Sequence, residues 1–153
     1  MISYLILLIL VLSLAQDGKG RIAALVFAIV CGGHSVLFGG LEGTAYFLSA
    51  AAADVIIVCF LCFKVPVSRL SDLLISISLL FWSVNSVGWL MWYFGQPIEP
   101  YYYSCLTLYL LTILSLLRKD GACESGINIF NSCFRYLGRP GYALRSVLRQ
   151  ASQ

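Results

Sequence analysis

The sequence predicts an all-α integral membrane protein, a compact bundle of five transmembrane helices followed by a basic amphipathic tail. Composition is the first reason, because 60% of the 153 residues are hydrophobic, 11% are charged and the mean hydropathy is +0.89. Soluble domains average about 45–50% apolar and about 25% charged residues. The second reason is that five apolar stretches approach the roughly 20 residues that a spanning helix needs. They cover residues 1–15, 22–38, 44–63, 73–94 and 101–117, and residues 118–153 form the tail.

The third reason is the position of the Lys and Arg residues, which also predicts an orientation. The ten bases are Lys19 and Arg21 after the first stretch, Lys64 and Arg69 after the third, and Arg118, Lys119, Arg135, Arg139, Arg145 and Arg149 after the fifth. The second and fourth connections, 39–43 and 95–100, hold only the acids Glu42 and Glu99. Cytoplasmic loops carry the Lys/Arg excess, so we expect the N-terminus outside and the C-terminus in the cytoplasm, in a plasma or inner membrane. Bases that flank apolar stretches, instead of forming one basic face, argue against nucleic acid as a partner.

The first stretch is short and invites a second interpretation, a cleaved signal peptide. Ser13-Leu14-Ala15 has the small-x-small pattern of a cleavage site. However, no base precedes the stretch, and cleavage would place every later base outside, against the charge rule. We therefore expect a retained span, although fifteen residues reach about 22 Å against a core of about 30 Å. Local bilayer thinning would have to absorb the difference.

The second and third stretches are expected to form a tight helical hairpin around the glycine-rich turn 39–43. Small residues recur at every fourth position on both, which lets helix backbones approach closely in lipid. The expected packing face consists of Ala24, Ala28 and Gly32 on one helix and Ala45, Ser49 and Ala53 on the other. The alternative is that Ala and Gly are simply frequent in membrane helices.

Aromatic residues gather beside the connections expected outside. They are Tyr46, Phe47, Trp89, Trp92, Tyr93, Phe94 and Tyr101 to Tyr103. Trp and Tyr are enriched where the bilayer meets water. We interpret the cluster as an interfacial belt in preference to an aromatic ligand cage.

The cysteines predict neither disulfides nor a metal centre. Cys31, Cys59, Cys62 and Cys105 fall inside spans and the other two, Cys123 and Cys133, in the cytoplasmic tail, away from oxidising surroundings. Cys59 and Cys62 form a C-x-x-C without further ligands nearby, whereas zinc needs about four. We expect no metal and no cofactor, and small apolar packing roles for these side chains.

The tail after residue 117 does not resemble another span. Ile127, Phe130, Phe134 and Leu137 follow helical spacing, and Gly138-Arg139-Pro140-Gly141 breaks the pattern. A second short helix follows, with Leu144, Val147 and Leu148 apolar. A basic amphipathic segment at a cytoplasmic end is typical of contact with anionic lipid headgroups. The predicted contacts are Arg135, Arg139, Arg145 and Arg149, and the alternative is a docking arm for a cytoplasmic partner.

A layer of polar residues interrupts the spans near the middle of the bilayer. Counted from the expected cytoplasmic ends at 1.5 Å per residue, Asp54 lies about 15 Å deep and His34 and Asn85 about 18 Å. Thr107 and Tyr109 lie about 13–17 Å deep by the same count. A charged side chain at that depth is costly and normally has a partner, for which His34 is the nearest chargeable candidate. The layer either carries protons or binds a small cation or polar solute, or it is a structural hydrogen-bond network with Asp54 protonated. The sequence favours the structural role, since no second acid lies at that depth.

Motifs for catalysis are missing, so we do not expect an enzyme. The sequence contains no H-E-x-x-H, no G-x-S-x-G and no phosphate-binding glycine loop. The favoured function is that of a polytopic membrane protein acting through helix association, as an accessory, assembly or partner-regulating subunit. Its expected partners are the lipid bilayer and another membrane protein or further copies of itself in a homo-oligomer. The alternative is a small transporter, channel or holin-like pore-forming protein that uses the polar layer.

Overall fold

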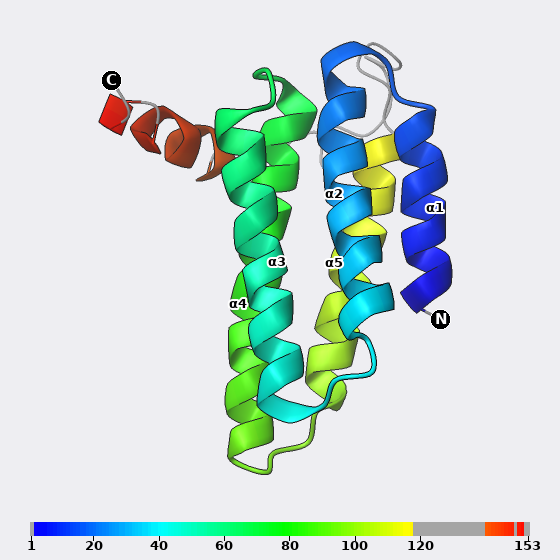
Figure 1. Cartoon of the computed structure of the whole chain (residues 1–153), viewed down its shortest axis with the longest axis vertical. Helices are drawn as coiled ribbons and strands as arrows, with labels where there is room; N and C mark the ends of the chain where they lie inside the picture. The colour runs from blue at the N-terminus through cyan, green and yellow to red at the C-terminus, as the bar shows by residue number, and fades with distance from the viewer. Residues whose placement is uncertain (1, 118–139, 149, 152–153) are drawn as a thin grey trace, which may run out of the picture.

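The structure, a computed structural model, describes residues 2–117, 140–148 and 150–151, and confirms an all-α fold. Five helices run side by side (Figure 1). They are α1 (Ile2–Leu14), α2 (Gly18–Phe38), α3 (Gly43–Phe63), α4 (Arg69–Tyr93) and α5 (Glu99–Leu117), and residues 140–148 are helical too. Each helix packs against the next one in the chain, α1 also packs against α5, and α2 reaches α4 across the bundle. The result is a closed ring of helices.

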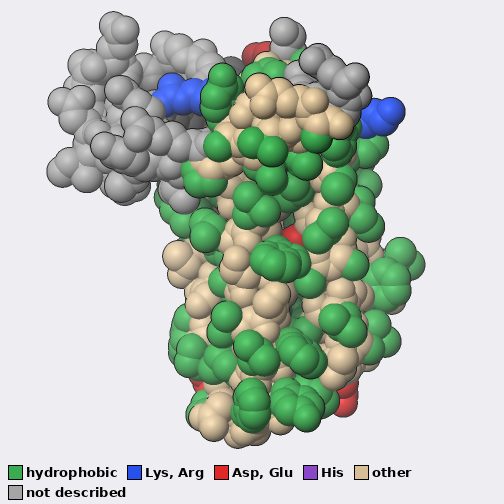
Figure 2. All heavy atoms as spheres, turned by 90° about the vertical axis from the view of Figure 1, so that its left-hand side faces the viewer, with side chains coloured by type: hydrophobic (Ala, Val, Ile, Leu, Met, Phe, Trp, Pro, Cys, Tyr) green, Lys and Arg blue, Asp and Glu red, His purple; other side chains and the backbone are tan. Residues whose placement is uncertain are grey.

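The two ends of the bundle differ in charge. The connections α1–α2 and α3–α4 lie at one end together with helix 140–148, and the other two connections lie at the opposite end (Figure 1). We call the first the base-rich end, because it carries Arg21, Lys64 and Arg69, and the second the base-poor end, which carries Glu42 and Glu99. On the face drawn in Figure 2, Lys and Arg side chains gather at the base-rich end, and hydrophobic side chains cover much of the middle. This is the surface of an integral membrane protein.

Four helices, α2 to α5, are long and apolar enough to cross a membrane, and α1 is not among them. With 13 residues, α1 reaches about 20 Å, short of a hydrocarbon core of about 30 Å. In Figure 1 its N-terminal end stops well before the base-poor end of the bundle. The structure therefore does not confirm the fifth span. Instead α1 lies along α2 and α5, and the Gln16 Nε2 donates a 2.6 Å hydrogen bond to the Leu116 carbonyl of α5.

Polar residues extend the helices beyond the apolar stretches that predicted them. The fourth helix begins at Arg69, because the Ser68 hydroxyl accepts from the Ser71 backbone N–H at 3.1 Å while the Ser71 hydroxyl accepts from the Ser68 N–H at 3.0 Å. This reciprocal capping box satisfies two backbone donors that otherwise have no partner. At the start of α3, Gly43 has a φ of +58°, and a Cβ there would lie 2.5 Å from the Trp92 ring. Only glycine fits this turn without strain.

The apolar core fills the base-rich half of the bundle. Large side chains from all five helices are almost completely buried there: Ile9, Phe27, Ile57, Leu61, Leu74, Ile75, Ile77 and Leu116. Several buried hydroxyls in this region bond to carbonyls of their own helices, as Ser13 does to Ile9 at 2.7 Å and Thr112 to Leu108 at 2.9 Å. Because such bonds need no partner from a neighbouring helix, side-chain packing holds this half together.

The small residues of the predicted packing face have different surroundings. Ala24 and Ala28 are buried in the core, but a Cβ on Gly32 would meet Ile6 of α1 at 3.5 Å, so this glycine faces α1. On α3, Ser49 and Ala53 are half-buried, whereas Ala45 is exposed. The buried side of α3 instead consists of Phe47, Ala50, Asp54, Ile57, Val58, Leu61 and Cys62. Repetition at every fourth residue predicted one packing face across α2 and α3, but part of that face serves other contacts.

Helix 140–148 docks on the base-rich ends of α3 and α4, and this corrects the prediction for Arg145. Its side chain is 3% exposed and does not face lipid headgroups. The guanidinium donates to the Leu61 carbonyl at 2.9 Å and to the Ser71 hydroxyl at 3.0 Å, and forms an ion pair with Asp72 at 3.3 Å. The last carbonyls of α3 carry the negative end of the helix dipole and lack partners within the helix. Arg145 therefore ends up buried because three acceptors meet there, which its own helix pattern does not reveal.

A second contact fixes the start of the docked helix. The Gly141 backbone N–H donates to the Ser76 hydroxyl at 2.9 Å, and a Cβ on Gly141 would overlap the Asp72 carbonyl oxygen. Glycine thus lets this helix approach α4 closely. The other predicted headgroup contacts, Arg135, Arg139 and Arg149, lie outside the described residues, as does the helical pattern predicted from residue 127 to residue 137.

Candidate functional site

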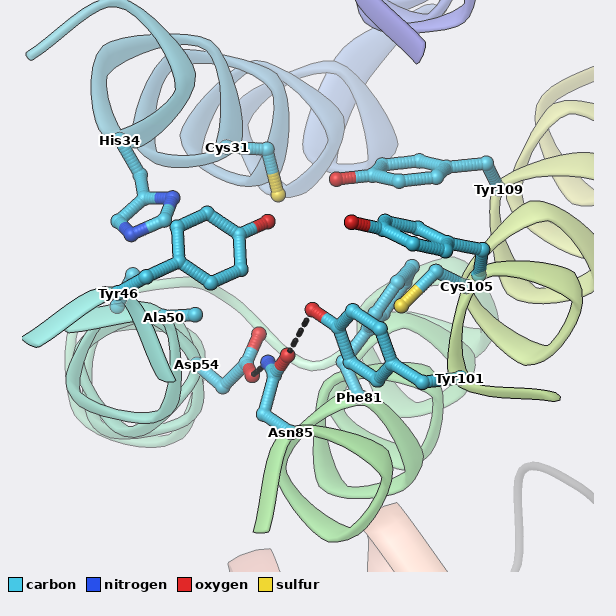
Figure 3. Close-up of a pocket in the computed structure, with 12 residues that line it drawn as sticks. Cys31, His34, Tyr46, Ala50, Asp54, Phe81, Asn85, Tyr101, Cys105 and Tyr109 are labelled. Carbon is cyan, nitrogen blue, oxygen red and sulfur yellow. Dashed lines mark hydrogen bonds between the residues drawn. The ribbon is translucent and has the colours of Figure 1, made fainter. Parts of the chain in front are cut away.

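A cavity of about 60 Å³ lies between α2, α3, α4 and α5 and gathers most of the predicted polar layer (Figure 3). Its lining consists of Cys31, His34, Tyr46, Ala50, Ala53, Asp54, Phe81, Asn85, Tyr101, Tyr102, Cys105 and Tyr109. Of the predicted layer, His34, Asp54, Asn85 and Tyr109 belong to this lining. Pockets for drug-sized ligands measure about 300–1,000 Å³, and one water needs at least about 10–15 Å³. The cavity therefore suits a few waters or one small solute.

Three side chains from three helices form a hydrogen-bonded chain at the wall of the cavity. The Asn85 Nδ2 donates to the Asp54 Oδ2 at 2.7 Å, and the Tyr101 hydroxyl donates to the Asn85 Oδ1 at 2.9 Å (Figure 3). All three residues are at least 94% buried. An amide can donate to a carboxylate while accepting from a hydroxyl, so Asn85 is the central member that links α3 to α5.

The second carboxylate oxygen of Asp54 points into the cavity (Figure 3). Among the described residues, only Asn85 bonds to this carboxyl group, and it uses the other oxygen, Oδ2. The hydroxyls of Tyr46 and Tyr109 also point toward the cavity centre, from opposite walls (Figure 3). Buried polar groups normally have hydrogen-bond partners. Oxygens that face an open space in the bundle are thus in position to bind water or a ligand.

His34 lies at the side of the cavity and does not pair with Asp54 as expected. Its Nε2 lies 3.0 Å from the Ser49 hydroxyl, and that hydroxyl donates to the Tyr46 carbonyl at 2.8 Å. Because the hydroxyl proton is committed to the carbonyl, the imidazole is the donor to Ser49. The ring also packs against Phe38 and Tyr46, with centroids 5.7 and 5.8 Å away. His34 thus joins α2 to α3, about one helical turn from the base-poor end of α2.

Thr107 was predicted in the polar layer, but the structure places it elsewhere. It is exposed, and its hydroxyl donates to the Tyr103 carbonyl of the same helix at 2.9 Å. The cavity side of α5 holds Tyr101, Cys105 and Tyr109, which follow one another at every fourth position. At about 100° per residue, Thr107 points roughly opposite to Cys105. Its depth was therefore no guide to the direction of its side chain.

The aromatic residues divide between the surface and the cavity. Trp92, Tyr93 and Phe94 are exposed, as an interfacial belt requires. Tyr46 and Tyr101, by contrast, line the cavity. The sequence pattern predicted these two and Tyr102 in the interfacial belt, and Cys31 and Cys105 in packing roles, so none of the five was predicted at a cavity. The spacing of Tyr101, Cys105 and Tyr109 could have indicated a shared face on α5.

A glycine on α4 lets two aromatic rings pack beside the hydrogen-bonded chain. A Cβ on Gly88 would lie 2.5 Å from the Tyr101 ring and 2.8 Å from the Phe47 ring. Those rings meet edge to face with centroids 5.2 Å apart, a favourable geometry for aromatic pairs. Gly88 lies one helical turn beyond Asn85, so this close approach helps to position the Tyr101 hydroxyl at the Asn85 amide.

The cavity lies between the middle of the bundle and the base-poor end. Asp54 lies near the middle of α3, about 14 Å from the Phe63 end and about 17 Å from the Gly43 end at 1.5 Å per residue. Asn85 lies about 24 Å from the Arg69 end of α4 and about 12 Å from the Tyr93 end, which is at the base-poor end. Further toward the base-rich end, Ile57, Leu61 and Leu74 are 0% exposed. On this side the polar space therefore ends against tightly packed apolar side chains of α3 and α4.

The residue types of the lining define the chemistry that the cavity offers. In the described part of the chain, no three His, Cys, Asp or Glu side chains meet as metal ligands require. The lining combines one carboxylate with tyrosine hydroxyls and thiols, and contains no Lys or Arg. Comparisons with protein-family models, curated proteins and solved structures gave no match. The geometry of the cavity is therefore the basis for proposing a function.

Proposed function

We propose that this chain is a small, non-enzymatic membrane transporter that binds a small cation or polar solute in the cavity beside Asp54. One observation carries the proposal: a buried carboxylate oxygen faces open space between four helices near the middle of the bundle. Ionisable groups at this depth are costly and typically belong to solute or proton pathways. In a purely structural network, protein partners would be expected to occupy both oxygens. This favours transport over the structural role that the sequence favoured.

The shape of the bundle supports a transporter more than an open pore. The cavity ends against the apolar core of the base-rich half, where Ile57 and Leu61 of α3 and Leu74 of α4 are 0% exposed. A site closed at one side is what alternating access requires in one of its states. A holin-like or channel function would need a continuous polar path instead.

The proposed orientation places the base-rich end in the cytoplasm, because Arg21, Lys64 and Arg69 lie there. The cavity then lies toward the outer side. Alkaline phosphatase fused after Glu42 or Glu99 should be active, and a fusion after Lys64 should be inactive. The reverse pattern would invert the orientation. The bases of the tail that lie outside the described residues remain proposed contacts for anionic headgroups.

The test of transport is solute or proton flux into proteoliposomes at two pH values, for the wild type and Asp54→Asn. Asparagine keeps the size of the side chain and can still bond to Asn85, but it cannot carry a charge or a titratable proton. We expect flux to fall to background while expression and thermal stability stay close to wild type. Thr107→Val is the matched control, because this polar residue lies at a similar depth outside the cavity, and it should transport normally. An Asn variant with full flux would refute the proposal.

A second candidate is the accessory, assembly or partner-regulating subunit, alone or as a homo-oligomer. It is favoured by the exposure of α2, in whose span 22% of residues are buried against 39–50% in the other three. Ile29, Val36 and Leu37 expose between 63% and 84% of their surface. Such a face can receive another helix in the membrane. Cross-linking in native membranes through cysteines placed at Ile29 and Val36 tests it. A cross-link to another protein chain would support this function, and the absence of any such cross-link would count against it.

A further inference from the structure

We infer that the cavity selects a small monovalent cation of the ammonium type, such as ammonium or methylammonium, an inference that rests on the proposed binding function of this cavity. The charge of the lining favours a positively charged ligand. The lining contains the carboxyl group of Asp54 and neither Lys nor Arg. The one basic residue in the described lining is His34, whose imidazole donates its hydrogen bond to the Ser49 hydroxyl. Oxygen acceptors with a single carboxylate in a low-dielectric space favour a cation over an anion.

Size restricts the candidates further. A volume of about 60 Å³ holds a few water-sized groups, enough for a small cation together with some water. Sugars and large quaternary amines exceed that space. The bound cation has to be small enough to lie between the walls formed by Tyr46 and Tyr109, whose hydroxyls point toward each other (Figure 3).

The number of available oxygens argues against divalent metal ions. Calcium takes six to eight oxygen ligands, and magnesium requires a nearly ideal octahedron. The cavity offers one open carboxylate oxygen of Asp54 and the hydroxyls of Tyr46 and Tyr109, while the Asn85 oxygen already accepts from Tyr101. The described lining of the cavity contains no second carboxylate that would balance a double charge.

Hydrogen bonding favours an ammonium ion over sodium or potassium. An ammonium group donates hydrogen bonds, and the Asp54 oxygen and the two tyrosine hydroxyls can all accept them. The hydroxyls of Tyr46 and Tyr109 point into the cavity from opposite walls, so both can accept from the same ion (Figure 3). A bound ammonium ion would also compensate the charge of a buried carboxylate, which is otherwise costly at this depth.

Equilibrium binding to the full chain in lipid nanodiscs tests the inference, with radiolabelled methylammonium as the probe. We expect saturable binding that unlabelled ammonium displaces and that a hundredfold excess of sodium, calcium or tetramethylammonium leaves in place. Asp54→Asn should weaken binding by at least about tenfold, because a hydrogen bond to a charged group is lost. Tyr109→Phe, which keeps the ring and removes the hydroxyl, should have a smaller effect, and Thr107→Val should bind like the wild type.

The outcomes separate this inference from the proposed function. If sodium, potassium or calcium displaces the probe as well as ammonium does, the ammonium selectivity is wrong. If methylammonium does not bind while Asp54-dependent flux of another solute is present, the substrate class is wrong and the transport function stands. If no cation binds and Asp54→Asn also changes no flux, both proposals fail. Binding that survives in Asp54→Asn would place the cation elsewhere and overturn the inference.

Discussion

The base-rich and base-poor halves of the bundle are filled in opposite ways. Toward the base-rich end, Phe27, Ile57 and Leu74 are 0% exposed and hydroxyls bond to their own helices. Toward the base-poor end, Asp54 and Asn85 meet across two helices beside a cavity. Polar groups that lack hydrogen-bond partners in the protein weaken helix packing. If one half of the bundle is to keep an open polar space, the other half must therefore hold the helices together. The base-rich half thus stabilises the bundle, and the base-poor half holds the cavity for which we propose a binding function.

Helix α1 contributes to this difference although it is too short to span. It covers α2 and α5 without reaching the base-poor end (Figure 1). Ile9 is 1% exposed, and Gln16 binds the Leu116 carbonyl near the end of α5. The additional helix therefore extends the apolar core of the base-rich half and leaves the cavity to the four longer helices.

The largest expected effect concerns the docked helix at the base-rich end. Arg145→Ala removes the guanidinium that pairs with Asp72 and binds the Leu61 carbonyl. Breaking a buried ion pair costs about 3–5 kcal/mol, so thermal unfolding in detergent should shift strongly downward. Arg21→Ala, at an exposed base of the same end, is the control and should change little. Equal stability of the two variants would refute the role of Arg145 as a structural contact of the base-rich half.

A smaller loss of stability is expected from a substitution at Gly88, beside the cavity, for which Gly33 of α2 provides the matched control. A Cβ on Gly88 would lie 2.5 Å from the Tyr101 ring, whereas a Cβ on Gly33 meets nothing within 4 Å. Gly88→Ala should cost about 1–3 kcal/mol through overpacking and should move Tyr101 away from Asn85. Gly33→Ala should be neutral or slightly stabilising, because alanine favours helix by about 1 kcal/mol. Similar melting temperatures for the two variants would contradict the close packing described at Gly88.

The sequence predicted positions along the helices better than directions around them. Counting residues placed Asp54, Asn85 and Tyr109 at similar depths, and the structure brings them to one cavity. The same count included Thr107, which points away, since depth contains no information about rotation around the axis. Arg145 shows a second limit: its own helix pattern predicted a lipid-facing side chain, but the acceptors that bury it lie 73 to 84 residues earlier in the chain.

Helix ends show a similar limit. The charge pattern predicted which connections share an end, because it depends only on which connections hold Lys and Arg, and not on how the helices pack. Apolar runs located α2 to α5 but placed the start of α4 at residue 73, four residues late, because its capping serines are polar. The first stretch was apolar enough for a span but too short, and only the structure shows it lying along α2 and α5.

The reactivity of native cysteines tests the central claim, that a water-accessible cavity lies beside a dry core, most directly. Cys31 lines the cavity and is half-buried, whereas Cys62 is 0% exposed near the base-rich end of α3. Two variants that each retain one of these cysteines are treated in nanodiscs with a small charged methanethiosulfonate reagent, and modification is followed by mass spectrometry. The reaction is run at alkaline pH, because the attacking species is the thiolate. The account predicts that Cys31 is modified much faster than Cys62, and that Asp54→Asn leaves Cys62 unreactive. Modification of Cys62 at the rate of Cys31, or no modification of Cys31, would contradict it.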